Sequence, residues 1–288
     1  MSAVDPTRST LTGHDRTAID RSRHTASLLQ TFTMREFKVR YRGSFLDLGW
    51  SLLTPLVLLA VYAVILTQVF NATAECGPYL SSAWTGLVIW TFFSTAFGNA
   101  SMSLIYSGEM LTKVYFPRET VPLAQVGVSL IDLAIGLGTL VLIMATQHYL
   151  GLGVDTTDPN GGISVTYHVI AVVPALAVTL VWTAAACVFG AILTTFLRDV
   201  GHFINLFLRA GFFATPVMYD ASIYPAGLRW LAIVNPIAVT IEAMRAALFC
   251  HVWPNGALIA AQFLAGSIAL GLSVLYMRRV EDRLVDVL

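Results

Sequence analysis

Six apolar runs, each about as long as a membrane-crossing helix, constrain the fold of this chain more than any other feature. They cover residues 48–70, 84–106, 123–150, 169–196, 203–219 and 257–277. The hydrocarbon core of a bilayer takes about 20 helical residues to cross. A helix is also the only structure in which an isolated segment satisfies its own backbone there. We therefore predict an all-α membrane protein with six transmembrane helices.

The composition agrees with this fold class and excludes several functions. Hydrophobic residues make up 56% and charged residues 12% of the 288 residues, against roughly 45–50% and about 25% in soluble domains. The 17 basic and 17 acidic residues cancel, so no net field favours nucleic acid as a partner. Three cysteines cannot form a disulfide scaffold, and no Cys/His cluster has metal-ligand spacing, so we expect no metal site.

The basic residues determine the orientation. Eight of the 17 precede the first run, and 14 of them fall on one side if both termini are cytoplasmic. The loops assigned to the other side between the first four runs carry no lysine or arginine. Because basic residues concentrate in cytoplasmic loops, we predict a multi-pass protein of the plasma (inner) membrane with both termini inside.

The domain organisation follows from these spans. Residues 1–23 are expected to form a disordered cytoplasmic tail, and residues 24–288 a single transmembrane domain. Within this domain, residues 24–47 are expected to form an interfacial helix, residues 107–120 an inner loop and residues 220–256 an outer segment. No secretory signal is recognised at the N-terminus.

The interfacial helix is predicted from apolar and basic residues that each recur at helical spacing. Its basic side either meets anionic lipid headgroups or holds the phosphates of a lipid-linked substrate. The candidate phosphate ligands are Arg35, Lys38, Arg40 and Arg42.

The outer segment contains two apolar runs, residues 228–234 and 237–249, that are too short to span. Asn235-Pro236 separates them. We predict a re-entrant helical hairpin that dips into the membrane from outside. Glu242 and Arg245 are three residues apart, on one helix face, and would neutralise each other at membrane depth. The alternative is an ordinary surface pair among the headgroups.

The chain lacks the motifs of an enzyme. It contains no GxxxxGK[ST] and no GxGxxG, so it does not hold ATP by those routes. Asp132, His148, His168 and His202 are scattered among the spans and form no recognisable acid–base pair. An intramembrane glycosyl- or acyl-transferase remains the alternative from another class.

Three segments carry a likeness to a known family through their order and spacing. They are residues 40–50 (RYRGSFLDLGW) followed by Thr54-Pro55, residues 109–119 (EMLTKVYFPRE) with Pro122, and Asn235-Pro236 with Arg245. They resemble the permease subunits of ABC exporters that move cell-surface polysaccharides, over about residues 30–280. The nearest likeness is to the permeases of cell-wall galactan exporters, which are related to O-antigen and teichoic-acid exporters.

The resemblance implies specific partners. A separate ABC ATPase subunit, in two copies, would carry ATP and magnesium, and the chain itself would need no cofactor. The permease would form a homodimer, contact membrane lipids and pass a lipid-linked polysaccharide. An exporter of the same architecture for a drug, lipid or small metabolite is the close alternative.

The same resemblance makes residues 109–119 a coupling helix on the ATPase. This loop is too apolar for a plain turn and too charged for lipid, which suits docking on a protein. The alternative is an ordinary basic inner loop with interfacial aromatic residues. The candidate coupling residues are Glu109, Lys113, Tyr115, Phe116, Pro117 and Arg118.

The family lines its channel with the first and fifth spans. The candidate channel residues are Tyr62, Gln68, Asn205, Arg209, Phe212 and Tyr219. Three of these fall with Pro216 on one stripe of the fifth span, where Arg209 either lines the pore or pairs with Asp132. Aromatic rings such as Tyr62 and Phe212 suit contact with sugars.

The outer hairpin is expected to gate the passage. The candidate gate residues are Asn235, Pro236, Glu242 and Arg245. Cys76 and Cys250 both fall outside in this topology, where thiols can be oxidised. They either pair, tying the hairpin to the first outer loop, or remain two free thiols.

Overall fold

The computed structural model describes residues 18–40, 45–68, 74, 76–108, 117–150, 167–281 and 283–284. All regular elements in these ranges are helical. They are α1 (Ala18–Arg40), α2 (Phe45–Gln68), α3 (Tyr79–Tyr106), α5 (Thr120–Tyr149), η1 (Tyr167–Ala171), α6 (Val172–Phe196), α7 (Val200–Ala214), η2 (Ala221–Ile223), η3 (Ala226–Leu228), α8 (Trp230–Val234), α9 (Pro236–Leu248) and α10 (Gly256–Arg279).

Four of the described helices are long and apolar enough to cross a membrane. They are α3, α5, α6 together with η1, and α10. The bent pair formed by Ala226–Val234 and Pro236–Leu248 could add a fifth span. The prediction of an all-α chain with several apolar spans is therefore confirmed at this coarse level.

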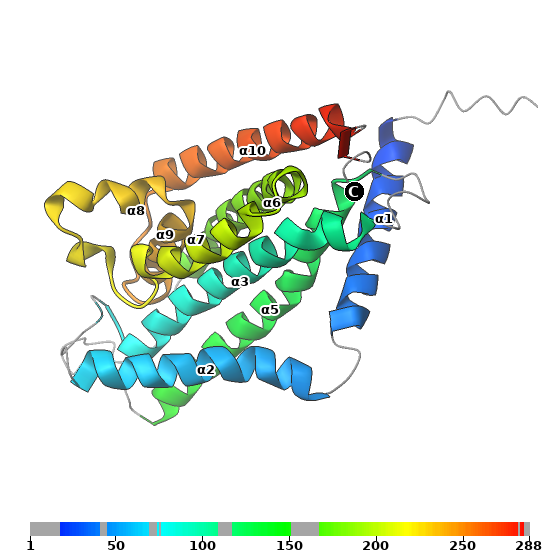
Figure 1. Cartoon of the computed structure of the whole chain (residues 1–288). Coiled ribbons are helices and arrows are strands. Elements are labelled where there is room, and N and C mark those ends of the chain that lie inside the picture. The colour runs from blue at the N-terminus through cyan, green and yellow to red at the C-terminus, as the bar shows by residue number, and fades with distance from the viewer. Residues whose placement is uncertain are drawn as a thin grey trace, which may run out of the picture.

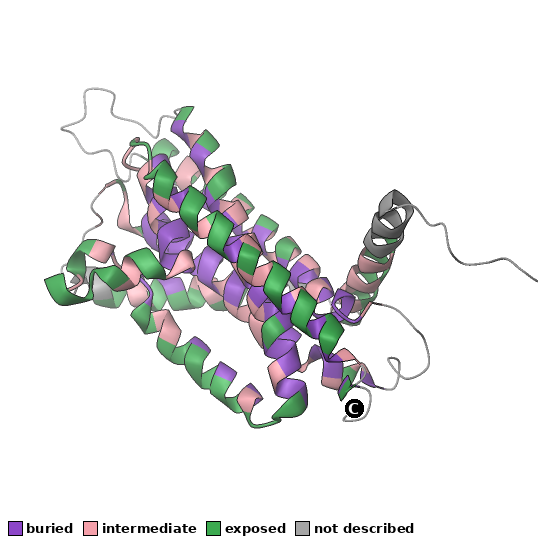
Figure 2. Cartoon of the chain, turned by 90° about the horizontal axis from the view of Figure 1, so that it is seen from above, coloured by how far each residue is buried: buried purple, intermediate pink, exposed green. Residues whose placement is uncertain are grey.

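The helix α3 forms the centre of the bundle, beside α5 and α6 (Figure 1). Its first half is almost entirely buried, with Trp84, Ile89 and Phe92 each at most 1% exposed. Figure 2 shows buried residues concentrated on the inner helices and exposed residues along their outward sides. Burial of these large apolar side chains specifies how the helices pack.

The helix α2 is more exposed than the rest of the bundle. Leu59 is buried against the core, but Val57, Val61 and Val64 are at least half exposed. The helix α2 has 24 residues in all, and the apolar stretch Leu53–Tyr62 lies within it.

The predicted fifth span is shorter than expected. The helix α7 ends at Ala214, and Thr215 is already extended with φ −100° and ψ 141°. Pro216 has no N–H and disfavours helical backbone in the residue before it, which agrees with the end of the helix at this point. A single helix through residue 219 is therefore wrong, and Pro216 does not lie on one helical stripe with Asn205, Arg209 and Phe212.

The predicted break in the outer segment is confirmed. The helices on either side of Asn235 are bent by 93°. The side chain of Asn235 accepts hydrogen bonds from the backbone N–H groups of Ile237 and Ala238, at 3.0 and 3.4 Å. It caps α9 in the way favoured for asparagine, and Pro236 occupies the first helical position.

The helix α1 starts earlier and ends earlier than predicted. It begins at Ala18, within the segment 1–23 that was expected to form the tail. No proline or glycine interrupts Ala18–Arg40, and charged residues alone do not break a helix. Residues 45–47 belong to α2 instead of the interfacial helix. The rest of the predicted tail lies outside the described residues.

Figure 1 places α1 and the C-terminus at one end of the bundle, with α8 and α9 at the opposite end. The helix α1 packs on α5, where the Gln125 side chain donates to a Glu36 carboxylate oxygen at 3.1 Å. The helix α1, expected inside, therefore lies at a different end of the molecule from α8 and α9, expected outside (Figure 1).

Candidate functional site

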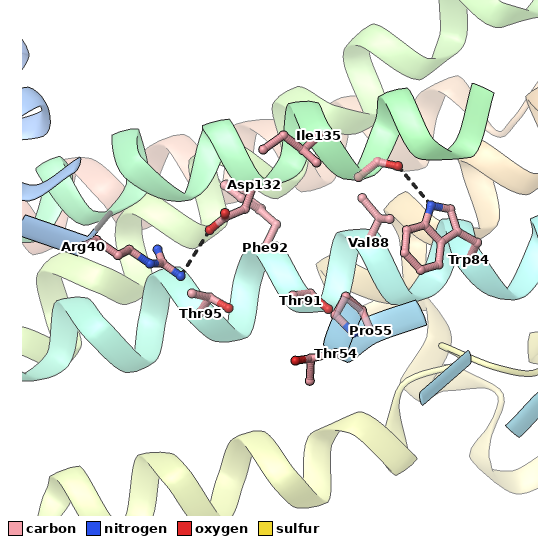
Figure 3. Close-up of a pocket in the computed structure, with 11 residues that line it drawn as sticks. Arg40, Thr54, Pro55, Trp84, Val88, Thr91, Phe92, Thr95, Asp132 and Ile135 are labelled. Atoms are coloured by element: carbon pink, nitrogen blue, oxygen red, sulfur yellow. Dashed lines mark hydrogen bonds and ion pairs between the residues drawn. The ribbon is translucent and has the colours of Figure 1, made fainter. Parts of the chain in front are cut away.

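An ion pair joins the end of α1 to the middle of α5. Arg40 Nη2 lies 3.2 Å from Asp132 Oδ2, and their side chains are 30% and 12% exposed. Figure 3 shows the two side chains pointing toward each other. A carboxylate partly removed from water is stabilised by a close cation, so α1 is fastened to α5 at this point.

The ion pair lies at the wall of a cavity of about 230 Å³. Thr54 and Pro55 of α2 and Thr91 and Thr95 of α3 line it from other sides (Figure 3). The cavity offers hydroxyl groups, one cation and one anion inside an apolar bundle. Such a mixture of apolar walls and a few polar groups is typical of sites for small polar ligands or for one end of a larger ligand.

Close approach of α3 to α5 shapes one wall of this cavity. The indole Nε1 of Trp84 donates to the carbonyl oxygen of Gly136 at 3.0 Å. A Cβ at Gly136 would come within 2.8 Å of Val88. Glycine is therefore required at this position for the two helices to pack as they do.

The alternative in which Arg209 pairs with Asp132 is wrong. Asp132 pairs with Arg40, while Arg209 lies exposed on α7. The pairing of Arg40 was missed because its helix was placed at the membrane surface. Only the position of α1 against α5 brings the two groups together.

The structure brings two of the predicted channel residues into contact. The rings of Tyr62 on α2 and Phe212 on α7 have centroids 6.2 Å apart, and Phe212 also lies 6.2 Å from Trp90 of α3. Both residues pack against the main hydrophobic core. This aromatic group joins α2 and α7 to the centre of the bundle.

The remaining channel candidates do not gather around the same point. The side-chain amide of Asn205 donates to the carbonyl oxygen of Gly201 at 3.0 Å. The hydroxyl of Tyr219 donates to the carbonyl oxygen of Phe213 at 2.7 Å, which satisfies an end carbonyl of α7. The side chain of Gln68 lies outside the described residues.

The candidate phosphate ligands separate into two groups. Arg35 and Lys38 are exposed on α1 and line a shallow surface groove. Arg35 also borders a second cavity of about 570 Å³ between α1, α3 and α5. Arg40 pairs with Asp132, and Arg42 lies outside the described residues.

At the opposite end of the molecule, Arg245 of α9 is the centre of a buried hydrogen-bond network. Its guanidinium lies 3.1 Å from Glu242 and 3.5 Å from Asp220. It also donates to four backbone carbonyls on α3 and on the segment 215–220. The acceptors are Ser82, Pro216, Val217 and Tyr219, at 3.3, 3.0, 2.7 and 2.7 Å.

This network confirms the predicted pairing of Glu242 with Arg245 and extends it. Asp220 was not predicted, although it is the only acidic residue between Asp199 and Glu242 and could have been considered as a partner. The segment 215–220 is held at two further points. The Tyr79 hydroxyl donates to Met218 O at 2.8 Å, and the Asn235 amide donates to the Thr215 hydroxyl at 2.8 Å.

A disulfide joins Cys76 to Cys250, with Cα atoms 5.1 Å apart and a separation of 174 positions in sequence. Gly77 has φ 67°, a conformation that favours glycine, and it lies directly against Phe249. The bond ties the segment before α3 to the end of α9. Cys187 is free and buried in α6.

The disulfide makes a simple prediction for thiol counting. We expect one thiol per chain in protein that is alkylated during lysis and denatured without reductant, and three after reduction, because the chain has three cysteines. Titration with a maleimide followed by mass spectrometry measures both numbers. The Cys76→Ser variant is the control and should show two thiols without reduction. Three thiols in the unreduced wild-type protein would contradict the bond.

Of the predicted coupling residues, only Pro117 and Arg118 are described. Pro117 is half-buried, and Arg118 is 8% exposed. The Arg118 guanidinium lies 3.4 Å from Glu281 near the C-terminus. The Arg118 side chain is therefore directed into the chain, and its role in coupling to the ATPase stays a prediction. Glu109, Lys113, Tyr115 and Phe116 lie outside the described residues.

Sequence comparison identifies the family. The model for the ABC-2 type transporter matches residues 27–249 of the chain. The chain belongs to the ABC-2 type transporter family. The match begins in α1 and ends at the close of α9, so it includes both the Arg40–Asp132 pair and the Arg245 network.

Two relatives of this ABC-2 transporter chain cover most of its length. The O-antigen export system permease protein RfbA of Myxococcus xanthus is 29% identical over 230 residues, which are 79% of this chain and 82% of the relative. A protein of the same name from Klebsiella pneumoniae is 25% identical over 262 residues, 91% of this chain and 95% of the relative. Both relatives are named as permeases of an export system.

Proposed function

We propose that this ABC-2 transporter chain is the transmembrane subunit of an ATP-driven exporter that passes a lipid-linked cell-surface polysaccharide, of galactan or O-antigen type, outward across the plasma membrane. The family match over residues 27–249 carries the proposal. Its support is the relatives named for O-antigen export, which align over 82% and 95% of their length.

The proposed topology has six spans with both termini in the cytoplasm. The four long apolar helices supply four spans, and α2 and α7 supply the first and fifth. The bent pair α8–α9 enters the membrane from outside without crossing it. Two observations support this orientation. Arg278 and Arg279 lie in the last turn of α10, as expected for an inner helix end, and Cys76 and Cys250 form a disulfide, as expected on an oxidising outer side.

The proposed passage forms between two copies of the chain. Apolar side chains are exposed along α2, such as Val57 and Val64, and along α7, such as Phe203 and Phe207. Such apolar faces can meet lipid or a second copy of the chain, and we assign these two to the second copy. The aromatic group of Tyr62 and Phe212 would then lie close to the sugar path, with Arg209 exposed beside it.

The proposed orientation in the membrane assigns roles to the residues at the two ends of the bundle. Arg35 and Lys38, exposed on α1, would meet the phosphates of the lipid-linked substrate at the inner surface. The outer gate would be the hairpin with Asn235, Glu242 and Arg245, whose network fastens α9 to α3. ATP and magnesium would be bound by two copies of a separate ATPase subunit.

Deletion of this chain in its host provides the test. Lipid-linked glycan is expected to accumulate on the cytoplasmic side of the membrane while surface glycan is lost, and the full chain should restore export. Normal surface glycan in the deletion strain would contradict the proposal and favour an exporter of another substrate. Turnover of a lipid-linked donor by the purified chain alone, without an ATPase, would favour a transferase.

A further inference from the structure

Four charged residues join the turn before α5 to the end of α10. Arg118 and Glu119 lie in the turn before α5, and Arg278 and Glu281 lie at the end of α10. We call these four residues the inner ion-pair cluster. The members of each pair are about 160 residues apart in sequence, being separated by 159 and 163 positions.

In the inner ion-pair cluster, each residue of the turn pairs with a residue of opposite charge at the end of α10. Arg278 donates through Nε and Nη2 to Glu119 Oε1, at 2.9 and 2.6 Å. Arg118 Nε lies 3.4 Å from Glu281 Oε1, and Arg118 also donates to the backbone carbonyl of Glu281. Two ion pairs and a backbone contact therefore hold one short turn against one helix end.

The inner ion-pair cluster differs from an ordinary surface network because two of its members are buried. Arg118 and Glu119 are only 8% and 5% exposed, whereas the side chain of Arg278 is 61% exposed. Surface ion pairs contribute little because water screens them, but a buried charge depends strongly on its partner. The two side chains of the turn are thus directed at α10, although they adjoin the loop expected to meet the ATPase.

The backbone around the turn is also well fixed. The Thr120 hydroxyl donates to the carbonyl oxygen of Pro117 at 2.6 Å, and the Thr120 N–H donates to the same oxygen at 3.1 Å. Glu119 lies at the N-terminus of α5 and Arg278 in the last turn of α10. Each charge has the sign that its helix end favours.

A hydrophobic cluster lies at the same end of the molecule and joins the same elements. Its buried members come from the ends of α3, α5, α6 and α10 and from the residues after α10. They are Leu104, Val121, Val188, Ala191, Ile192, Met277, Val280 and Leu284. A close-packed group of this kind moves as a unit more readily than it deforms. Displacement of the turn would therefore be passed to the end of α10.

We propose that Arg118 and Glu119 are positioning residues that couple movement of the turn 117–119 to α10. This inference rests on the proposed function, since it needs an ATPase that acts on the loop preceding the turn. If this coupling holds, α10 and the helix α6 packed beside it move in response to nucleotide on the ATPase. A chain of packed and paired groups between two sites is the physical means by which such coupling travels.

The test uses the complex of the full chain with its ATPase subunit, to which ATP and magnesium are added. Hydrogen exchange of the peptide covering residues 270–281 reports on α10. In the wild-type complex, nucleotide is expected to change exchange in this peptide. In the Arg278→Gln, Glu281→Gln variant we expect the ATPase to co-purify and hydrolyse ATP, but the exchange response to be lost. Export per ATP should fall by roughly 5-fold or more, the lower end of coupling between sites.

Arg279→Gln is the matched control, because Arg279 is the exposed neighbour of Arg278 on the same helix turn and loses the same charge. It should respond as the wild type does. A charge swap distinguishes loss of the ion pair from misfolding. Glu119→Arg alone should lose the exchange response, and the Glu119→Arg, Arg278→Glu double variant, which restores an ion pair, should regain it. A swap no better than the single change, or a full response in the Arg278→Gln, Glu281→Gln variant, would overturn the inference.

The two proposals can fail separately. If no ATPase co-purifies with the wild-type chain and nucleotide changes nothing, the proposed function fails. If the wild-type complex responds at the ATPase and transports glycan but residues 270–281 do not change, only the coupling through α10 is wrong.

Discussion

Replacing Arg245 by alanine is expected to destabilise the protein by about 3–5 kcal/mol, the range for breaking a buried ion pair by removing one partner. Arg245 is 5% exposed, and Asp220 beside it is 7% exposed. The change leaves that carboxylate without its cation and removes the donor to carbonyl groups of α3 and of the segment 215–220. Unfolding of the full chain in detergent, followed by circular dichroism, measures the loss.

A matched variant and a conservative variant distinguish this effect from a simple loss of charge. Arg229 is exposed in the same outer segment, so Arg229→Ala should change the unfolding free energy by about 0.5 kcal/mol or less. Lysine at position 245 keeps the charge but cannot reach several carbonyls in a fixed fork, and it should fall between the two. If Arg245→Ala were as stable as Arg229→Ala, the network would not be what holds the segment 215–220.

The long helices of this protein could be predicted from the sequence, because length and hydropathy alone define them. The predicted spans 123–150 and 257–277 differ from α5 and α10 by only a few residues at each end. The break at Asn235-Pro236 was likewise readable, since the cap and the proline act locally. The end predicted for the fifth run was wrong because the apolar run continues beyond α7, which ends at Ala214 before Pro216.

Some ion pairs could likewise be predicted from the sequence and others could not. Glu242 and Arg245 are neighbours on one helix, so their pairing followed from local spacing. The pairing of Arg40 with Asp132 depends on where α1 meets α5, which no local pattern specifies. Arg118 illustrates the same limit, because a sequence read as an inner loop does not reveal that one of its side chains turns inward.

Replacing Gly86 by alanine is expected to destabilise the protein by about 3 kcal/mol or more, the upper end of the penalty for overpacking. A Cβ at this position would lie 2.1 Å from the carbonyl oxygen of Val217, and further backbone atoms of Val217 lie within 3.0 Å. Backbone cannot rotate away as a side chain can. The same carbonyl accepts a hydrogen bond from Arg245 at 2.7 Å, so moving it also weakens the outer network. Detergent unfolding of the full chain measures the change.

Gly138→Ala is the control, because Gly138 lies within α5 with nothing inside 4 Å of the added Cβ. There the same substitution should be neutral or stabilising by up to about 1 kcal/mol, since alanine favours a helix more than glycine does. Two variants that differ only in position should thus shift stability in opposite directions. Because Gly86 and Arg245 act on one carbonyl, the Gly86→Ala, Arg245→Ala double variant should lose less than the sum of the single losses. Strict additivity would mean that α3 and α9 hold the segment 215–220 independently.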